Sequence, residues 1–212
     1  MAEKKKYYLA YGSNLNMNQM AFRCPTAKPV GTAKITGYEL LYKGSKTGAY
    51  LTIEPKEDSF VPVAVWEVGA EDEKHLDVYE GFPHFYYKKY INIQMVQKNG
   101  RRKRVDAFVY IMHENRKCAI PDNWYIKGCA DGYNAFGFDT KILEAAYTRT
   151  LEILVAEIEA QPHRECPICG RLYTEHPAIS RADNETEICP ECGVNEALED
   201  FERYLEAEYE KD

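Results

Sequence analysis

Four cysteines near the C-terminal end of the chain restrict its fold more than any other feature. They occur in the stretches CPICG and CPECG, where Cys166, Cys169, Cys189 and Cys192 follow the spacing C-x2-C-x19-C-x2-C. Two intervening residues let one tight turn present two thiolates to the same ion, and Zn2+ prefers four such ligands in a tetrahedron. The glycine after each pair lets the backbone fold beneath the sulfurs. The spacing therefore predicts a zinc site, in preference to four unrelated thiols.

The total cysteine count agrees with metal binding. The chain has seven cysteines, an odd number, and four of them sit in two close pairs. This favours metal ligation in a reducing compartment over a disulfide framework. Four protein thiolates leave no coordination position open, so the expected zinc is structural and no catalytic cofactor is expected. Cys24, Cys118 and Cys129 have no evident base partner in the sequence and are interpreted as ordinary thiols.

Acidic residues concentrate in the same part of the chain. From Cys166 onward there are 4 Lys and Arg against 13 Asp and Glu, a net charge of −9, whereas the preceding 165 residues carry +2. The change predicts a domain over residues 1–160 and a small module over residues 161–212, with AQPHRE as the linker. A module of this size builds little core and needs a metal staple. Its charge would repel phosphate, so we expect no nucleic-acid partner.

Membrane and secretory segments are not expected. No apolar run approaches the roughly 18 residues that span a bilayer. The N-terminal stretch MAEKKKYYLAYG contains basic residues, but its apolar part is too short for a signal peptide. We therefore expect a cytoplasmic protein with no membrane partner.

The hydrophobic pattern before the linker predicts an α+β domain. Short strands are expected at residues 7–11, in ITGYELLYKG, in AYLTIEP and in VPVAVWEV, which Pro62 would limit near one end. The runs YYKKYINIQMVQ and RVDAFVYIM flank an Asn-Gly pair and predict a hairpin. Its basic tip, Arg101 to Arg104, is interpreted as a solvated surface.

Helices are expected at residues 16–22, with Asn16 as the cap, at residues 70–79 and at residues 139–159. The apolar face of the last comprises Ile142, Leu143, Ala146, Leu151, Leu154, Val155 and Ile158. The aromatic and glycine-rich stretch PDNWYIKGCADGYNAFGF is interpreted as a loop.

A further amphipathic helix follows the second cysteine pair. Its apolar stripe comprises Val194, Ala197, Leu198, Phe201, Tyr204, Leu205 and Tyr209. Docking of this stripe on the protein's own body is the favoured interpretation. A protein partner or self-association through the C-terminal module is the alternative.

Two stretches of the first domain suggest chemistry. In YYLAYGSNLN a strand passes directly into a small polar turn, which can present bare N–H groups to an anion. In HLDVYEGFPHFYYKKY, Glu80 ends a helix and precedes Gly81, a position suited to a left-handed stop. The negative helix end and the neighbouring rings of Tyr79, Phe82 and Phe85 would raise the pKa of Glu80 toward the range of a general base. From local sequence alone, an ordinary surface glutamate remains the alternative.

These stretches together resemble the γ-glutamylcyclotransferases. AYGSNL follows an N-terminal strand, and LDVYEGFP with a tyrosine pair follows some seventy residues later. GAYLTIEP, DAFVYIM and PDNWYIKGCADGYNAFGF come in the same order and spacing, so the resemblance covers about residues 6–155. It implies a small mixed β-barrel with flanking helices. It also implies an acyltransferase- or lyase-type reaction, in which a γ-glutamyl amide is cyclised to 5-oxoproline and its amine is released.

The resemblance also implies roles for individual residues. Glu80 matches the family's catalytic glutamate. The residues implied to bind a small γ-glutamyl substrate are Tyr8, Leu9, Ala10, Tyr11, Gly12, Ser13, Asn14, Tyr110 and Tyr125. For Tyr110 and Tyr125, a packing role is an equal alternative to direct contact.

The cysteine module departs from the single-domain pattern of the family. It leaves open whether the leaving group is an amino acid, a small amine or something larger. The alternative function is a catalytically idle barrel that serves as a scaffold, with the zinc module and the acidic helix mediating protein interactions.

Overall fold

The computed structural model describes residues 5–45, 47–161 and 163–209. Contacts divide the chain into two compact units, Met1–Val155 and Ala156–Asp212, which we describe separately. This division falls inside a helix, a few residues before the boundary expected at 160/161, which stays a prediction. Pro162 of the expected linker lies outside the described residues.

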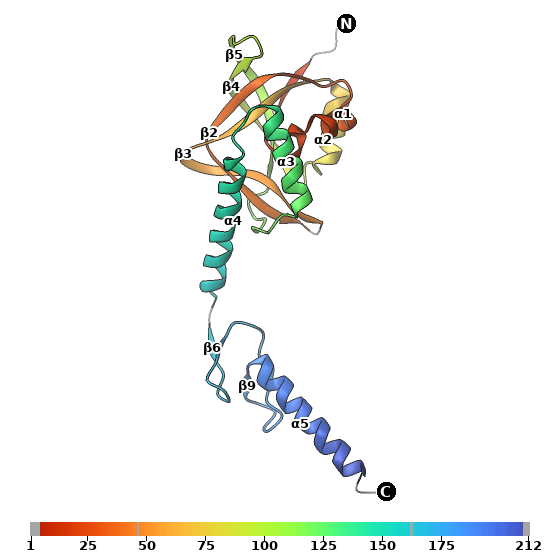
Figure 1. Ribbon diagram of the computed structural model, residues 1–212, viewed down its shortest axis with the longest axis vertical. Helices are drawn as coiled ribbons and strands as arrows, with labels where there is room; N and C mark the ends of the chain where they lie inside the picture. Colours follow the sequence, from red (N-terminus) through yellow and green to blue (C-terminus); the bar gives the residue numbers. More distant parts are fainter. Residues whose placement is uncertain (1–4, 46, 162, 210–212) are drawn as a thin grey trace. The chain divides into compact units, whose positions relative to one another are not determined.

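The first unit is built on a closed five-stranded barrel (Figure 1). Its strands are β1 (Lys6–Ala10), β2 (Lys28–Ser45), β3 (Gly48–Val68), β4 (Tyr86–Gln97) and β5 (Arg102–Met112). They close in the order β1-β3-β2-β4-β5, with β1 and β5 parallel and the other pairs antiparallel. The small mixed barrel with flanking helices implied by the resemblance is confirmed.

Strands β2 and β3 form one long hairpin instead of the short runs that the sequence suggested. They contain 18 and 21 residues, and register shifts occur at Pro29/Gly31 and Thr36/Tyr38. Such irregularities let long strands curve around a barrel. Pro62 does not limit β3, because it pairs with Lys34 of β2. On its other side, β3 pairs with β1 only from Ala64 to Val68. Pro62 therefore lies where β3 has no β1 neighbour that would need its missing N–H.

The predicted hairpin between β4 and β5 is confirmed. Its register runs from Tyr86 opposite Met112 to Val96 opposite Arg102, and Gly100 in the turn has φ of 80°. A positive φ is the conformation that glycine adopts without strain. The side chains of Arg101 to Arg104 are exposed, as expected for a solvated tip.

Two predicted helices stand close to the end of β1. After a short 3-10 turn, η1 (Ser13–Leu15), helix α1 covers Met17–Arg23, and α2 covers Ala70–Tyr79. The side chain of Asn16 accepts hydrogen bonds from the N–H groups of Asn18 and Gln19 at 3.1 and 3.2 Å. This is the predicted cap.

The expectation of a loop around residues 121–138 is wrong. Most of this stretch is helix α3 (Asn123–Ala135), capped by Asp122, whose carboxylate accepts from the N–H of Tyr125 at 2.7 Å. At least one of the glycines that suggested a loop serves packing instead. A Cβ atom on Gly132 would lie 2.5 Å from the Cβ of Leu15, so only glycine allows α3 to approach η1 this closely.

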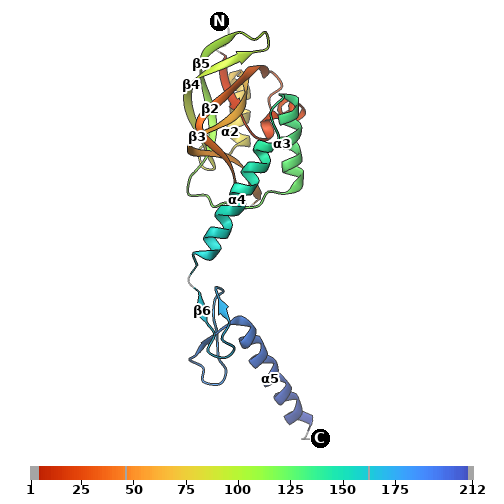
Figure 2. The same ribbon diagram turned by 60° about the vertical axis from the view of Figure 1, so that its left-hand side comes forward.

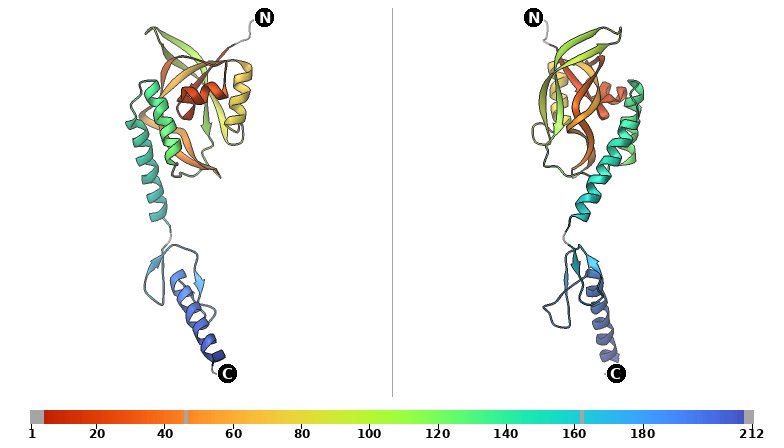
Figure 3. Two further views of the ribbon diagram at one scale, coloured as in Figure 1. Left: turned by 45° about the vertical axis from the view of Figure 1, so that its right-hand side comes forward. Right: turned by 90° about the vertical axis from the view of Figure 1, so that its left-hand side faces the viewer.

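Helix α4 (Lys141–Glu159) lies beside α3 against the barrel (Figures 2 and 3). The ring of Tyr42 on β2 contacts both Tyr125 of α3 and Tyr147 of α4. Thr150 is fully buried, and its hydroxyl accepts from the N–H of Tyr42 at 3.0 Å. The expected apolar face is buried only in its first half, because Leu151, Val155 and Ile158 are exposed.

The second unit has little regular structure besides one helix. Its elements are β6 (Arg164–Glu165) paired with β7 (Leu172–Tyr173), β8 (Ala178–Ile179) paired with β9 (Glu187–Ile188), and α5 (Pro190–Tyr209). Its buried core comprises Cys166, Tyr173, Ile188, Cys189 and Cys192, with Ala178 packed against them.

The apolar stripe of α5 is not buried. The side chains of Val194, Leu198, Phe201, Tyr204 and Leu205 are 39–59% exposed. Docking of the stripe on the first unit, the favoured interpretation, stays a prediction, as does a partner on this surface. The side chain of Tyr209 lies outside the described ones. No helix in the described ranges is both long and apolar enough to cross a membrane.

The first unit should fold without the second, because its barrel core and the buried half of α4 are complete by Thr150. A chain ending at Gln161 should melt cooperatively within a few degrees of the barrel transition of the full chain, measured by circular dichroism. A chain ending at Gly137 is the matched comparison. It loses α4 and with it the Thr150–Tyr42 contact, and should melt at a clearly lower temperature. Equal melting of the two truncated chains would contradict this account.

Candidate active site and cysteine cluster

A cavity of about 540 Å³ opens beside the turn that follows β1. Its volume lies within the range of small-molecule sites. Eight of the ten residues implied by the resemblance line it: Tyr8, Tyr11, Gly12, Ser13, Asn14, Glu80, Tyr110 and Tyr125. The structure therefore brings the YGSN turn and the Glu-Gly stretch together, although 66 residues separate Asn14 from Glu80 in the chain.

Leu9 and Ala10 are not brought to the cavity. They belong to β1, where they pair with Val65 and Ala64 of β3, and their side chains are 0% and 1% exposed within the core. Their burial and pairing fix β1, the strand that carries the turn, within the core. A contact of either residue with substrate stays a prediction that this geometry does not support.

Glu80 is placed by the end of α2. Its N–H donates to the carbonyl of Leu76 at 2.8 Å, and the next residue, Gly81, has φ of 62°. This is the left-handed helix stop that the sequence predicted, and it turns the chain away just after Glu80. The helix therefore ends with the carboxyl group at the cavity wall.

The amide of Asn14 joins the turn to Glu80. Its Nδ2 atom donates to Glu80 Oε1 at 2.9 Å and to the hydroxyl of Tyr8 at 2.9 Å. Its Oδ1 atom accepts from Arg23 Nη1 at 2.5 Å. Both amide hydrogens and the amide oxygen are thus engaged, which fixes which end of the amide faces Glu80.

Arg23 is a site residue that the sequence did not reveal. Besides Asn14, its guanidinium donates to Ser13 Oγ at 3.3 Å and Gln19 Oε1 at 2.7 Å, and it lies 3.7 Å from the ring centroid of Tyr79. It is the last residue of α1, one of 27 basic residues in the chain. The only available indication was its position one short helix after the YGSN turn.

Burial raises the pKa of Glu80 to about 7. Desolvation by the surrounding cavity is the largest cause, while the positive charge of Arg23 and the hydrogen bond from Asn14 oppose it. The direction agrees with the sequence argument. A carboxyl group with this pKa exchanges a proton readily near neutrality, which suits a general acid and base.

The two tyrosines implied by the resemblance differ in their hydrogen bonds. Tyr110 lines the cavity with its ring, but its hydroxyl donates to Asp77 at 2.7 Å, and Asp77 in turn pairs with Lys88. The hydroxyl of Tyr125 accepts the N–H of Leu51 at 3.0 Å. A Cβ atom on Gly12 would lie 3.3 Å from that hydroxyl. A packing role therefore fits Tyr110, whereas Tyr125 stands directly beside the turn.

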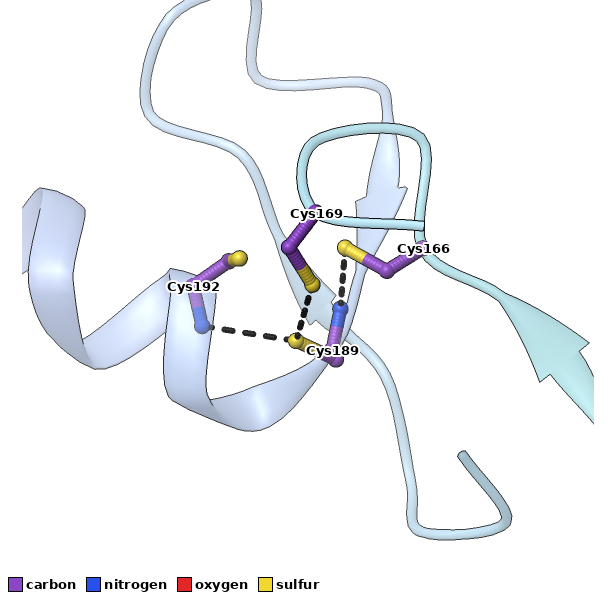
Figure 4. Close-up of side chains that lie close together, drawn as sticks. All are labelled: Cys166, Cys169, Cys189 and Cys192. Carbon is purple, nitrogen blue, oxygen red and sulfur yellow. Dashed lines mark hydrogen bonds between the residues drawn. The ribbon is translucent and has the colours of Figure 1, made fainter. Parts of the chain in front are cut away.

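The four C-terminal cysteines converge on one point (Figure 4). Cys166 and Cys169 lie on the loop after β6, Cys189 lies between β9 and α5, and Cys192 lies in the first turn of α5. All four Sγ atoms lie within 4.8 Å of one another, and those of Cys169 and Cys189 are 3.8 Å apart. Zn–S bonds of about 2.3 Å in a tetrahedron require sulfur separations of about 3.8 Å. The cluster is thus consistent with the expected zinc module.

The sulfurs also receive backbone hydrogen bonds. The N–H of Cys189 donates to the sulfur of Cys166 at 3.3 Å, and that of Cys192 to the sulfur of Cys189 at 3.5 Å. For Cys166, desolvation raises the pKa, but backbone hydrogen bonds outweigh it and lower the pKa to about 6, which favours the thiolate form that a metal requires. By contrast, Cys24 and Cys129 in the first unit are buried, and burial raises the pKa of each thiol to about 12. They are ordinary protonated thiols, as interpreted from the sequence.

Comparisons with known proteins agree with this geometry. The family described as gamma-glutamyl cyclotransferase, AIG2-like, matches residues 8–127. A solved structure named gamma-glutamyl cyclotransferase is 24% identical with a TM-score of 0.58, and the match covers 68% of this chain and 86% of that one. An uncharacterised protein from Homo sapiens is 25% identical with a TM-score of 0.57, covering 68% and 87%. YkqA from Bacillus subtilis is 15% identical with a TM-score of 0.56, covering 72% and 56%. No curated protein matches the chain.

The raised pKa of Glu80 has a consequence for stability. The pKa is about 7 in the folded chain and about 4.3 in an unfolded one, so the folded chain holds the proton more tightly. The resulting stabilisation is fully present below the unfolded pKa and is lost as the pH rises through 7. Glu80→Gln cannot ionise. The free energy of unfolding of Glu80→Gln minus that of wild type should therefore be larger at pH 8 than at pH 5. The increase should be at most about 3 kcal/mol.

Urea denaturation at pH 5 and pH 8 measures this difference. Glu71→Gln is the matched control, because Glu71 is an exposed residue on α2 that pairs only with Lys74. This variant should show no such gain at pH 8. A Glu80→Gln effect that is the same at both pH values would show that the folded pKa is not raised.

Proposed function

This chain belongs to the gamma-glutamyl cyclotransferase, AIG2-like family, and we propose that it releases 5-oxoproline from a γ-glutamyl amino acid or a γ-glutamyl amine. One observation carries the proposal. Glu80, with a pKa of about 7, is bonded to Asn14 of the YGSN turn in a cavity of small-molecule size. A buried acid–base group facing a polar turn is what an intramolecular acyl transfer requires.

The reaction needs one base and no other reagent. The neutral α-amine of the γ-glutamyl group attacks its own γ-carbonyl carbon, and a new C–N bond closes the five-membered ring. Glu80 takes the proton from the attacking nitrogen and returns it to the nitrogen of the breaking amide bond. The products are 5-oxoproline and a free amine. A positioned acid–base group of this kind contributes on the order of 10²- to 10⁴-fold in rate.

The turn after β1 supplies the donors in this scheme. The tetrahedral intermediate carries an oxyanion and the substrate carries an α-carboxylate, and both need N–H groups. Gly12, Ser13 and Asn14 line the cavity wall, and the Asn14 amide connects this turn to Glu80. In the proposed scheme their backbone N–H groups are the donors. One oxyanion donor typically contributes about 10²- to 10³-fold.

Arg23 acts behind the turn as a positioning residue. Its bond to Asn14 Oδ1 keeps the Asn14 Nδ2 atom directed at Glu80, and its charge lowers the Glu80 pKa against the effect of burial. A higher pKa would leave Glu80 protonated at neutral pH and unable to accept the proton of the amine. Arg23 therefore supports the base form.

Turnover tests the proposed function directly. Wild type should release 5-oxoproline from members of a panel of γ-glutamyl amino acids and γ-glutamyl amines, measured by chromatography. Glu80→Gln should lose at least about 10²-fold of this rate, because it can neither accept nor return the proton. Glu71→Gln, on the exposed face of the same helix, should keep the wild-type rate.

The alternative function predicts the opposite pattern. If the barrel is an idle scaffold, for which the exposed stripe of α5 would be the interaction surface, no member of the panel is cyclised. Full turnover by Glu80→Gln would also contradict the mechanism, because Glu80 would then not be the base.

We propose further that the cysteine cluster binds a structural zinc ion. The core of the second unit consists of three of the ligand cysteines with Tyr173 and Ile188, which is too small to hold it folded alone. Binding of structural zinc supplies about 10–16 kcal/mol in comparable small domains. A thiolate site also fits a reducing compartment, and we infer a cytoplasmic location.

The purified full chain should contain zinc in about a 1:1 ratio, measured by plasma mass spectrometry. Cys189→Ser removes one ligand and should lose most of the metal, together with hydrogen-exchange protection of β9 and the first turn of α5. Cys118→Ser changes a buried cysteine of the first unit and should keep both. Zinc content that is unchanged in Cys189→Ser would refute the assignment.

A further inference from the structure

The cavity contains a charge that the proposed reaction does not use. Among the described residues that line it, Glu80 and Arg116 are the only acidic and basic ones, and the others are uncharged. Glu80 serves as the proposed acid–base group. Arg116 has no part in the proton transfers. Glu80 apart, the other described lining residues are uncharged, so this guanidinium is suited to binding an anionic group of the ligand.

Arg116 is held at the cavity by its neighbours. It lies in the segment after β5, where its N–H donates to the carbonyl of His113 at 3.1 Å. His113 in turn is bonded to the segment after Glu80, with its N–H 3.3 Å from the carbonyl of Phe85 and its Nε2 2.8 Å from that of Pro83. The two segments that carry Glu80 and Arg116 are therefore tied to each other.

The guanidinium itself lacks an ionic partner. Its central carbon lies 4.9 Å from the ring centroid of Phe85, and the side chain is half-buried. In the part of the chain that the structure describes, no carboxylate lies within ion-pair distance of it, whereas Arg149, Arg171, Arg181 and Arg203 each have one. A planar guanidinium that packs on an aromatic ring and faces a cavity is suited to binding a carboxylate of a ligand.

A γ-glutamyl amino acid carries two carboxylates, one on its glutamyl part and one on the departing amino acid, and they must lie at different places in the cavity. The glutamyl carboxylate shares a carbon atom with the attacking amine, so it must lie near Glu80 and the Gly12–Asn14 turn. The carboxylate of the departing amino acid lies beyond the γ-carbonyl, on the far side of the breaking bond. The contacts of Arg116 are with Phe85 and His113 and not with Glu80 or Asn14.

We propose that Arg116 binds the carboxylate of the departing amino acid, so that this chain acts on γ-glutamyl amino acids in preference to γ-glutamyl amines. The inference rests on the proposed cyclisation, and it narrows the substrate to one class. A γ-glutamyl amine offers nothing to Arg116 and would leave its guanidinium without a partner in the cavity.

Two substrates that differ only in the carboxylate provide the test. γ-Glutamylalanine and γ-glutamylethylamine share every other group. Wild type should have a higher kcat/KM for γ-glutamylalanine. Arg116→Ala should reduce kcat/KM for γ-glutamylalanine roughly 10- to 100-fold more than for γ-glutamylethylamine, because a charge-assisted hydrogen bond is lost only with the first. Arg116→Lys keeps a point charge and should show a smaller loss of preference.

Lys117→Ala is the matched control, since it removes an exposed positive charge from the same segment and Lys117 does not line the cavity. It should keep the wild-type preference. Equal losses for both substrates in Arg116→Ala would overturn the proposal and assign Arg116 to the glutamyl half or to the fold. No loss for either substrate would overturn it as well.

Binding separates this proposal from the proposed reaction. Calorimetric titration of Glu80→Gln with the two compounds measures the preference without turnover, and the same titration of Glu80→Gln/Arg116→Ala should show the preference lost. Equal affinity of Glu80→Gln for both compounds would refute the role of Arg116 even if wild type is active. Failure of wild type to release 5-oxoproline would refute the reaction, and the site would then be one that binds γ-glutamyl amino acids only.

Discussion

One side-chain amide holds the site together. Asn14 directs its two amide hydrogens to Glu80 and Tyr8 and receives Arg23 on its oxygen. Through these bonds it connects β1, α1 and the end of α2. Asn14 is 3% exposed, and a buried amide with unmet hydrogen bonds would cost about 1–3 kcal/mol. The relative positions of Glu80, Tyr8 and Arg23 therefore depend on this amide being satisfied in one orientation.

The same arrangement sets the protonation of Glu80 by a balance of opposed effects. Burial disfavours the carboxylate and is the largest influence, whereas Arg23 and Asn14 favour it. A cavity without Arg23 would give a carboxyl group that stays protonated at neutral pH. A more exposed one would give an ordinary glutamate with a pKa near 4.3. Only the combination places the pKa near 7, where a group can accept and return a proton within one reaction.

The sequence was most informative where local chemistry decides the structure. Asn16, Gly81 and Asn99-Gly100 act through their own backbone conformations, and the cap, the helix stop and the hairpin turn were all predicted. Helix α3 was not predicted, because glycines such as Gly132 are typical of loops. Close contact with Leu15 is what requires a glycine at this position. The length of β2 and β3 depends on closure of the barrel, which a short stretch of sequence does not predict. Arg23 and Arg116 were missed for the same reason: the direction of a long side chain follows from the fold and not from its neighbours in sequence.

The two units differ in how much apolar core they bury, and the cavity belongs to the first unit whereas the proposed metal site belongs to the second. The first unit buries a large apolar core, so it can include a polar cavity with a destabilising carboxyl group at its wall. The second unit has only a few buried side chains, and three of them are ligand cysteines. Its stability would therefore depend on the proposed zinc ion, and its shape on the tetrahedral arrangement of the four sulfurs. A cluster whose four positions are all filled by protein sulfur has none left for a substrate. The proposed cyclisation needs no metal in any step, since the proton that Glu80 removes is the one that the leaving nitrogen requires.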